Sequence, residues 1–70
     1  MAVKHRIREL AEKQGYNISS LSRKADIGQS TVRRLWHDPF RHPDIPVLER
    51  IAKVLGVRTG DLLEDVPDDV

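Results

Sequence analysis

Apolar residues recur at helical spacing in two neighbouring stretches of the chain, residues 18–25 and residues 29–36. In residues 18–25, the second and third apolar residues lie three and seven positions after the first. In residues 29–36, they lie three and four positions after the first. These apolar positions are Ile18, Leu21, Ala25, Val32, Leu35 and Trp36. Such spacings place side chains along one stripe of a helix. The pattern therefore predicts two short amphipathic helices whose apolar stripes, Trp36 included, face the core.

Three residues, Asp26, Ile27 and Gly28, separate the two predicted helices. Aspartate tolerates the left-handed backbone conformation that ends a helix, although less well than glycine does. Ile27 is apolar and is expected to fill the gap between the helices, while Gly28 can begin the second one. Asn17 is a good N-cap for the first. Helix, three-residue turn and helix form the layout of the helix-turn-helix unit, whose second helix enters the major groove of DNA.

Before this unit, residues 2–13 carry another helical stripe, formed by Val3, Ile7, Leu10 and Ala11. The stripe predicts a helix over the whole of residues 2–13. Gly15 suits the left-handed conformation that follows a helix end. His5 lies off the stripe and is therefore expected on the surface.

After the unit, residues 37–46 contain three prolines and are predicted to form a loop. Phe40 and Ile45 are expected to anchor this loop to the core. A fourth helix is predicted from Pro46 or Val47 to Leu55. Its buried stripe is formed by Leu48, Ile51, Ala52 and Leu55. A short fifth helix is predicted over residues 59–64, with Leu62 and Leu63 both packed inward.

The chain has 70 residues and no cysteine, so neither a disulfide nor a thiolate metal site can support its fold. This length predicts a single domain over residues 1–66, with the helix-turn-helix unit at residues 18–36 and a frayed acidic tail at residues 67–70. No apolar run approaches the ~20 residues of a membrane span, and no secretory signal is present. We therefore expect a soluble, cytoplasmic protein with no membrane association.

Charge is distributed unevenly, although the formal net charge is only +1. Residues 1–41 contain nine lysines and arginines and four acids, whereas residues 42–70 contain three lysines and arginines and seven acids. A basic half joined to an acidic half suggests a domain that binds a polyanion on one of its sides.

Residues 6–64 resemble the Cro and phage-repressor (XRE-type) helix-turn-helix family. The segment RIRELAEKQGYNISSLSRKADIGQSTVRRLW is similar to the family's first three helices, and DIPVLERIAKVLGVRTGDLLE to its closing segment. The resemblance implies an all-α domain of five helices that acts as a sequence-specific, double-stranded-DNA-binding transcriptional regulator. One module of this size reads only a few base pairs, so a homodimer on a two-fold operator is expected. The resemblance implies that the two copies meet through the fifth helix and the loop before the fourth.

The chain departs from the family pattern at three places. Asp26 stands where the family usually has glycine, and Ser22 where it often has alanine. Ser22 is still small enough for two helices to approach closely. The family often follows its recognition helix with a turn similar to Glu-Asn-Gly, whereas this chain continues with residues 36–39, WHDP. That loop is therefore expected to differ in shape and in its contacts.

Outward positions on the second helix of the unit supply the candidates for reading bases. Gln29 and Arg33 are four residues apart, as are Ser30 and Arg34, so each pair shares a face. Glutamine can form two hydrogen bonds with adenine, arginine two with guanine, and serine can pair with either. In the family that the chain resembles, these four positions include the usual base readers.

The start of the first helix of the unit offers free amides and a positive dipole end to a DNA phosphate. Basic and hydroxyl side chains nearby can add to this attraction, although the methyl of Thr31 could instead contact a thymine. The candidates for backbone contact are Asn17, Ser19, Ser20, Arg23, Lys24, Thr31 and Arg41, and Arg6 adds sequence-independent attraction.

An enzyme is not expected, because no glycine-rich phosphate loop and no G-x-S-x-G motif is present. The group His37, Asp38, His42 and Asp44 fits no standard zinc spacing, so neither a metal nor a cofactor nor a small-molecule substrate is expected. The alternative function is a protein-interaction or antitoxin-like adapter module built on the same fold. The two arginines and the glutamine on the outward helix face favour DNA over this alternative.

Overall fold

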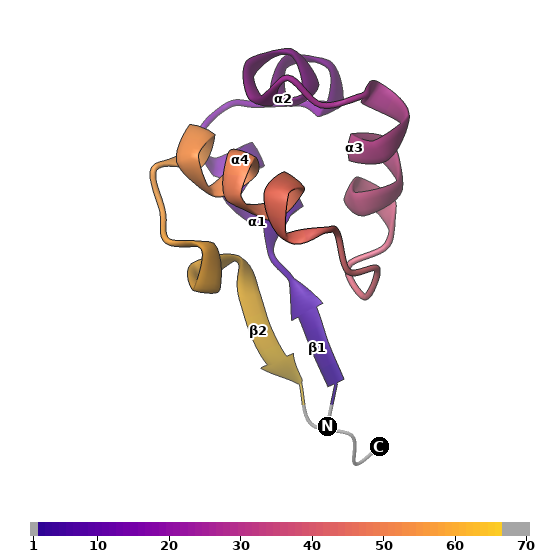
Figure 1. The fold of residues 1–70 in the computed structure, drawn as a ribbon, viewed down its shortest axis with the longest axis vertical. Helices are drawn as coiled ribbons and strands as arrows, with labels where there is room; N and C mark the ends of the chain where they lie inside the picture. The colour runs from indigo at the N-terminus through magenta and orange to yellow at the C-terminus, as the bar shows by residue number, and fades with distance from the viewer. Residues whose placement is uncertain (1, 67–70) are drawn as a thin grey trace.

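The computed structural model describes residues 2–66, which form four α-helices, a short 3₁₀ turn and a two-stranded sheet (Figure 1). In chain order these elements are β1 (Ala2–His5), α1 (Ile7–Lys13), α2 (Ile18–Ala25), α3 (Gln29–His37), α4 (Ile45–Leu55), the 3₁₀ turn (Thr59–Leu62) and β2 (Leu63–Val66). The prediction of a mostly helical repressor-like domain is confirmed. The prediction of five helices and no strand is wrong. The acidic tail predicted at residues 67–70 lies outside the described residues.

The five largest fully buried side chains of the core come one from each helical element. These five residues are Ile7, Leu21, Val32, Ile51 and Leu62. The other predicted stripe residues of α2, α3 and α4 surround them, and Trp36 is only 8% exposed. The helical periodicity of residues 18–55 therefore identified the buried face of three helices correctly.

Helix boundaries follow the capping residues. Gly56 ends α4 with a left-handed backbone (φ 71°), and the amide of the next residue, Val57, donates to the carbonyl of Ala52 at 3.0 Å. Pro46 lies in the first turn of α4, where a missing N–H breaks no helical hydrogen bond. The predicted end of the helix at Leu55 is confirmed, and its start lies at Ile45, one residue before the earliest predicted position.

The first predicted helix begins too early, because Ala2–His5 form a strand instead. β1 pairs antiparallel with β2, with Val3 opposite Asp65 and Lys4 opposite Glu64. The Arg6 amide donates to the carbonyl of Leu62, and helix α1 begins only after this bond. Val3 and Ile7 fit a helical spacing, but the partner that holds β1 extended lies about sixty positions later in the chain. The helical periodicity within residues 2–13 gives no information about such a distant partner.

The fifth predicted helix is also wrong, because a single 3₁₀ turn leads directly into β2. Leu62 is fully buried, whereas Leu63 is 38% exposed. Neighbouring residues of a strand point to opposite sides, so the first residue of β2 cannot follow Leu62 into the core. The prediction that both leucines pack inward is correct only for Leu62.

The loop between α3 and α4 is held by polar contacts and not by the two predicted apolar anchors. Phe40 is 52% exposed and Ile45 is 63% exposed. The His5 amide donates to the carbonyl of Pro39 at 2.8 Å, and His42 Nε2 lies 2.9 Å from the carbonyl of Val3. The loop is therefore fastened along the outer edge of β1.

His5 is buried, with 3% of its surface exposed, so the prediction of a surface histidine is wrong. Its Nε2 lies 3.0 Å from the carbonyl of Asp38, the residue that ends α3, and its Nδ1 has no partner among residues 2–66. Burial lowers the pKa of His5 below its usual 6.5, although the Asp38 carbonyl opposes this shift. The histidine therefore connects the sheet to the end of α3 in its neutral form.

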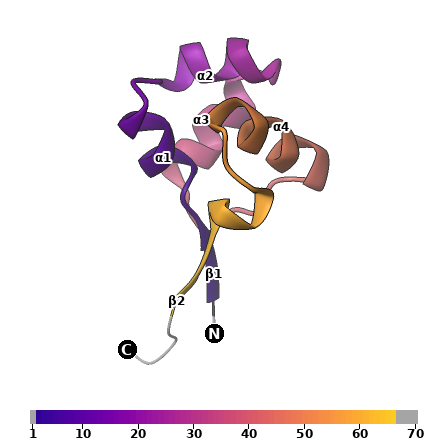
Figure 2. The same cartoon turned by 90° about the vertical axis from the view of Figure 1, so that its left-hand side faces the viewer.

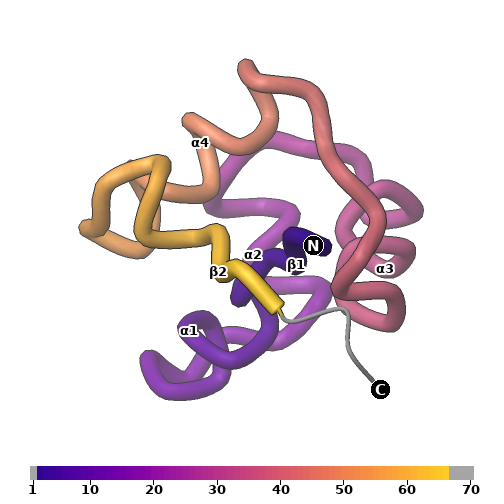
Figure 3. Tube along the Cα trace, turned by 90° about the horizontal axis from the view of Figure 1, so that it is seen from below, coloured from indigo at the N-terminus to yellow at the C-terminus, as the bar shows by residue number. Residues whose placement is uncertain are grey.

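The sheet forms a narrow ribbon that extends away from the helices. Figures 1 and 2 show β1 and β2 at one end of the long axis and α2 at the other. Viewed along the ribbon, α1, α3 and α4 lie on different sides of it (Figure 3). Within the described residues, none of the helices has the length and apolar character needed to cross a membrane.

Candidate nucleic-acid interface

The turn between α2 and α3 has the geometry that its sequence predicts. Asp26 adopts the left-handed conformation (φ 57°, ψ 50°), and the amide of Ile27 donates to the carbonyl of Ser22 at 2.9 Å. Ile27 is partly buried against the core, which confirms that it fills the space between the helices. Gly28 then begins α3, because its carbonyl accepts from the amides of Thr31 and Val32. The turn fixes the position of α3 relative to α2.

All four predicted base-reading side chains are exposed on α3. Val32, Leu35 and Trp36 occupy the buried face of the same helix. Within residues 2–66, no hydrogen bond or ion pair involves the side chains of the outward group, Gln29, Ser30, Arg33 and Arg34. The outward face of α3 therefore presents donors and acceptors that are available to an external ligand.

Two shallow grooves flank α3, and several of the predicted contact residues line each of them. The first joins α3 to the start of α2, and its lining includes Asn17, Ser19, Gln29 and Arg33. The second lies between α3 and the following loop, and its lining includes Thr31, Arg34 and Arg41. Each groove thus brings together base-reading and backbone candidates, which in the first groove are up to 16 positions apart in the chain.

The start of α2 is closed by a reciprocal cap. Asn17 Oδ1 accepts from the amide of Ser20 at 2.8 Å, and Ser20 Oγ accepts from the amide of Asn17 at 2.9 Å. The Ser20 hydroxyl also donates to the carbonyl of Asn17 at 3.3 Å, so its only proton is used inside the cap. The amides of Ile18 and Ser19 have no acceptor among residues 2–66. These two amides and the Ser19 hydroxyl, which makes no hydrogen bond within residues 2–66, remain as donors for an anion, whereas the Ser20 hydroxyl does not.

The remaining backbone candidates differ in position. Arg23 and Lys24 are exposed in the last turn of α2, and Arg41 is exposed in the loop after α3. Arg6 lies elsewhere, beside α1, where its Nη2 donates to Glu9 Oε2 at 2.8 Å. The hydrogen bond from Arg6 lowers the pKa of Glu9, so this carboxylate stays charged at neutral pH. The guanidinium of Arg6 is therefore already matched by an internal acid.

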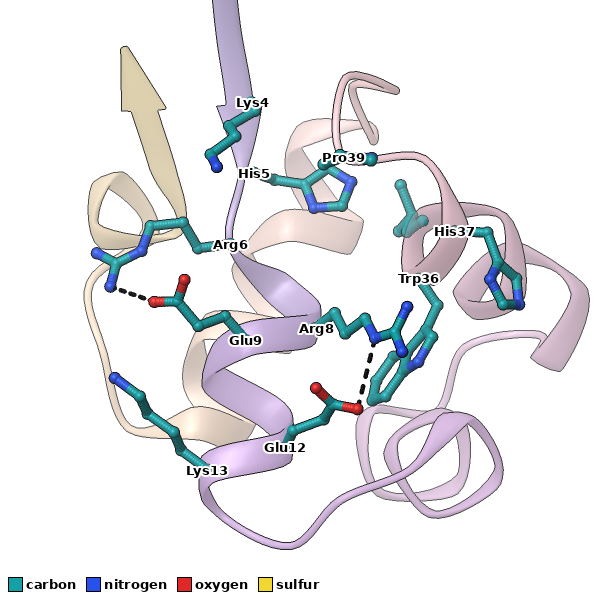
Figure 4. Close-up of a pocket in the computed structure, with 11 residues that line it drawn as sticks. Lys4, His5, Arg6, Arg8, Glu9, Glu12, Lys13, Trp36, His37 and Pro39 are labelled. Carbon is teal, nitrogen blue, oxygen red and sulfur yellow. Dashed lines mark hydrogen bonds and ion pairs between the residues drawn. The ribbon is translucent and has the colours of Figure 1, made fainter. Parts of the chain in front are cut away.

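Sequence reasoning missed two arginines that shape this interface. Arg50, on α4, donates through Nη1 to the carbonyl of Asp26 at 3.0 Å and so ties α4 to the turn. Arg8, on α1, lies over the ring of Trp36 with its Cζ 5.9 Å from the ring centroid. Arg8 Nε also donates to Glu12 at 3.4 Å (Figure 4). Both contacts join residues that are distant in the chain or that lie off the apolar stripe, so no local pattern marks them.

Each groove has one acidic residue in its described lining, Glu12 in the first and Asp44 in the second. Glu12 lines the same groove as Asn17, Gln29 and Arg33. Figure 4 shows Arg8 between Trp36 and Glu12, with its guanidinium over the indole. Arg8 thus balances the one carboxylate that borders the groove beside the start of α2.

Comparison with known proteins places this arrangement among DNA-binding domains. A family model described as the Cro/C1-type helix-turn-helix DNA-binding domain matches residues 6–68. A crystal structure of SinR, the master regulator for biofilm formation, in complex with DNA is similar, with a TM-score of 0.75 and 30% identity over 81% of this chain and 90% of that chain.

Two further SinR structures match the chain. The solution structure of the N-terminal DNA-binding domain of SinR from Bacillus subtilis has a TM-score of 0.74 and 30% identity, covering 86% of this chain and 87% of that chain. A complex of the SinR and SinI proteins has a TM-score of 0.75 and 30% identity, covering 81% of this chain and 55% of that chain. The curated proteins include no match.

Proposed function

The chain belongs to the family of Cro/C1-type helix-turn-helix DNA-binding domains and is a DNA-binding transcription regulator, and from this premise we propose that α3 reads the major groove of a specific duplex sequence. The observation that carries the proposal is the outward face of α3. Gln29, Arg33 and Arg34 are exposed there and have no partner among residues 2–66. The family model describes this fold as a DNA-binding domain.

The two grooves beside α3 suggest how the roles divide. Gln29 and Ser30 lie in the first turn of the helix, the part that meets base edges in this class of domain. Arg33 and Arg34 follow one turn later, and each can form two hydrogen bonds with a guanine. Each such contact contributes roughly 1–3 kcal/mol of discrimination against a wrong base.

Phosphates are held on both sides of the reading helix in this proposal. On one side, the free amides of Ile18 and Ser19 lie at the positive end of the α2 dipole, with Asn17 as the cap. On the other side, Thr31 and Arg41 both line the second groove and can offer a hydroxyl and a guanidinium to a phosphate. Arg23 and Lys24 add attraction that does not depend on sequence.

A pair of chains on a two-fold site completes the proposal. One α3 has nine residues, and its exposed part reaches only a few base pairs. Domains of this kind bind as dimers to half-sites about 34–36 Å apart, which doubles the sequence that is read.

The test begins with selection of bound duplexes from a randomised pool, followed by competition measurements on single alanine variants. Gln29→Ala, Arg33→Ala or Arg34→Ala should each weaken binding of the selected duplex by roughly 10- to 100-fold. Gln29→Ala should barely change binding to unrelated DNA, whereas the two arginine variants should weaken binding to unrelated DNA by a much smaller factor, because each removes one positive charge. Arg23→Ala is the matched control, because loss of a phosphate contact should weaken all duplexes alike and reduce the salt slope by about one.

Circular dichroism establishes that each variant keeps its helices. If a folded chain with alanine at Gln29, Arg33 and Arg34 still bound the selected duplex specifically, this result would contradict a reading role for α3.

A further inference from the structure

The sheet has two outer edges, and only one of them is covered. The Arg6 amide bonds to the carbonyl of Leu62, so the hydrogen-bonded pairs of the antiparallel ladder continue at Lys4 with Glu64. The intervening residues of β1, Val3 and His5, therefore turn their backbone groups outward. Two of their four outward groups are occupied by the loop after α3, because His42 contacts the Val3 carbonyl and the His5 amide donates to Pro39.

The same alternation turns the backbone groups of Leu63 and Asp65 outward from β2. The Leu63 amide closes the 3₁₀ turn by donating to the carbonyl of Gly60. The Leu63 carbonyl and both backbone groups of Asp65 have no partner within residues 2–66. Leu63, Glu64 and Asp65 are all exposed, so this edge is open to an added strand.

The charge on β2 decides which kind of strand can be added. Lys4 partly balances Glu64, with Nζ 3.7 Å from Oε1, but within residues 2–66 no cation pairs with Asp65. Because opposite charges across two strands stabilise the pair and like charges weaken it, the edge favours a strand that carries lysine or arginine. The same acids disfavour contact between this edge and DNA.

A second copy of the chain is a poor occupant of the edge, because like charges would meet in every symmetric pairing. Centring an antiparallel β2–β2 ladder on Glu64 or on Asp65 sets that acid against its own copy. Centring it on Leu63 sets Asp61 against Asp65. In-register parallel pairing places each acid beside its copy. Like charges directly opposite each other destabilise a strand pair.

We propose that the β2 edge binds an extended basic segment of another protein by strand addition. The backbone of the added strand would accept a hydrogen bond from the Asp65 amide and donate hydrogen bonds to the carbonyls of Asp65 and Leu63. Its lysine or arginine side chains would face Glu64 and Asp65. A third strand also supports a ribbon that has only two strands of its own. The ribbon and α2 lie at opposite ends of the molecule (Figure 1), so the partner leaves the DNA-binding end uncovered.

This inference does not depend on the proposed reading of DNA, and a peptide titration without DNA tests it. The 70-residue chain, labelled with ¹⁵N, is titrated with acetyl-KVKVKV-amide while its amide signals and their exchange with solvent are followed by NMR. We expect signal shifts and slower exchange at Asp65 and neighbouring β2 residues, with unchanged signals on α3. Two matched peptides are the controls: acetyl-EVEVEV-amide, and KVKVKV with alternate backbone nitrogens methylated.

Variants of the chain separate the edge from general charge. Asp65→Lys should weaken binding of KVKVKV roughly two- to tenfold, because attraction across the strand pair becomes repulsion. Glu49→Lys makes the same change of charge on the exposed face of α4 and should leave this affinity unchanged. Asp65→Asn removes the charge with less disturbance and should give an intermediate loss.

Three results would overturn the proposal. Equal shifts with the methylated peptide would mean that charge alone attracts the lysines. Unchanged amide exchange at Asp65 would mean that no strand is added. Concentration-dependent shifts confined to β2 in the absence of peptide would identify a second copy as the occupant.

Discussion

Charged side chains are used differently at the two ends of this molecule. Around α1 and the ribbon, three cations are matched by carboxylates within the chain, in the pairs Lys4–Glu64, Arg6–Glu9 and Arg8–Glu12, whereas Lys13 has no ion pair within residues 2–66. On α2 and α3, four exposed cations take part in no ion pair within residues 2–66, namely Arg23, Lys24, Arg33 and Arg34.

This difference shows which cations can attract a polyanion. A guanidinium that already contacts a carboxylate gains little from a phosphate, because the internal pair must first be broken. Unmatched cations gain the full attraction and release counterions from DNA when they bind. The four unmatched cations on α2 and α3, more than the net charge of +1, therefore support the proposal that these two helices form the DNA-binding end.

The largest effect on stability is expected where the ribbon meets the core. Leu62→Ala removes a fully buried side chain and should lower the free energy of unfolding by about 2–5 kcal/mol. Leu63→Ala, one residue later and 38% exposed, is the matched control and should cost less than 1 kcal/mol. Urea denaturation measures both. Equal losses would mean that both leucines pack inward and that β2 does not begin at Leu63.

A smaller effect is expected from removing the partner of Glu12. Arg8→Ala leaves this carboxylate unbalanced in the groove that it shares with Asn17 and Arg33, so duplex DNA should bind about two- to fivefold more weakly at low salt. Glu12→Gln in the same chain should restore the affinity. Failure of this second change to rescue binding would show that Arg8 contacts DNA itself or that its contact with Trp36 is what matters.

Asp26→Gly tests the turn at the DNA-binding end without touching a charged pair. Asp26 holds a left-handed conformation that glycine adopts without a steric penalty, so the substitution should stabilise the domain by about 0.5–1 kcal/mol. The contact from Arg50 involves the backbone carbonyl and is retained. A fall in the denaturation midpoint would indicate that the aspartate side chain supports the turn.

The mildest test changes only the pH. Burial lowers the pKa of His5 in the folded chain, so the unfolded chain binds this proton more readily. The stabilising contribution is therefore fully present above about pH 6.5 and is lost as pH falls through the lower pKa of the folded state. Thermal unfolding between pH 7.5 and pH 5 should show a smaller loss for His5→Gln than for the parent chain. His37→Gln, at an exposed site, should behave like the parent.

The same two regions also differ in how well their structure follows from the sequence. From Asn17 to Gly56, each element is defined by signals within a few residues: a cap at Asn17, a left-handed turn at Asp26, and apolar stripes along the helices. Ordinary helical spacing also placed Gln29, Arg33 and Arg34 on the exposed face of α3. Local rules suffice there because local contacts determine the structure.

The two ends of the chain did not follow from such signals. The strand Ala2–His5 exists because residues 63–66 lie beside it, and the burial of His5 depends on Asp38 and the loop after α3. A helical stripe within residues 2–13 carries no trace of these distant partners. Ser20 illustrates a subtler limit, since the hydroxyl expected to meet a phosphate is used by the cap of its own helix.

The most direct test compares unmatched with matched cations in one binding experiment. Fluorescence anisotropy of a random-sequence duplex is measured across a salt series for the parent chain, for Arg33→Ala/Arg34→Ala, and for Lys4→Ala/Arg6→Ala. We predict that binding by the parent chain depends steeply on salt. The α3 variant, Arg33→Ala/Arg34→Ala, should bind more weakly and with a salt slope smaller by one to two. The variant Lys4→Ala/Arg6→Ala should bind nearly as well as the parent. Equal losses in the two variants, or no binding by the parent at low salt, would contradict the assignment of α3 as the DNA-binding face.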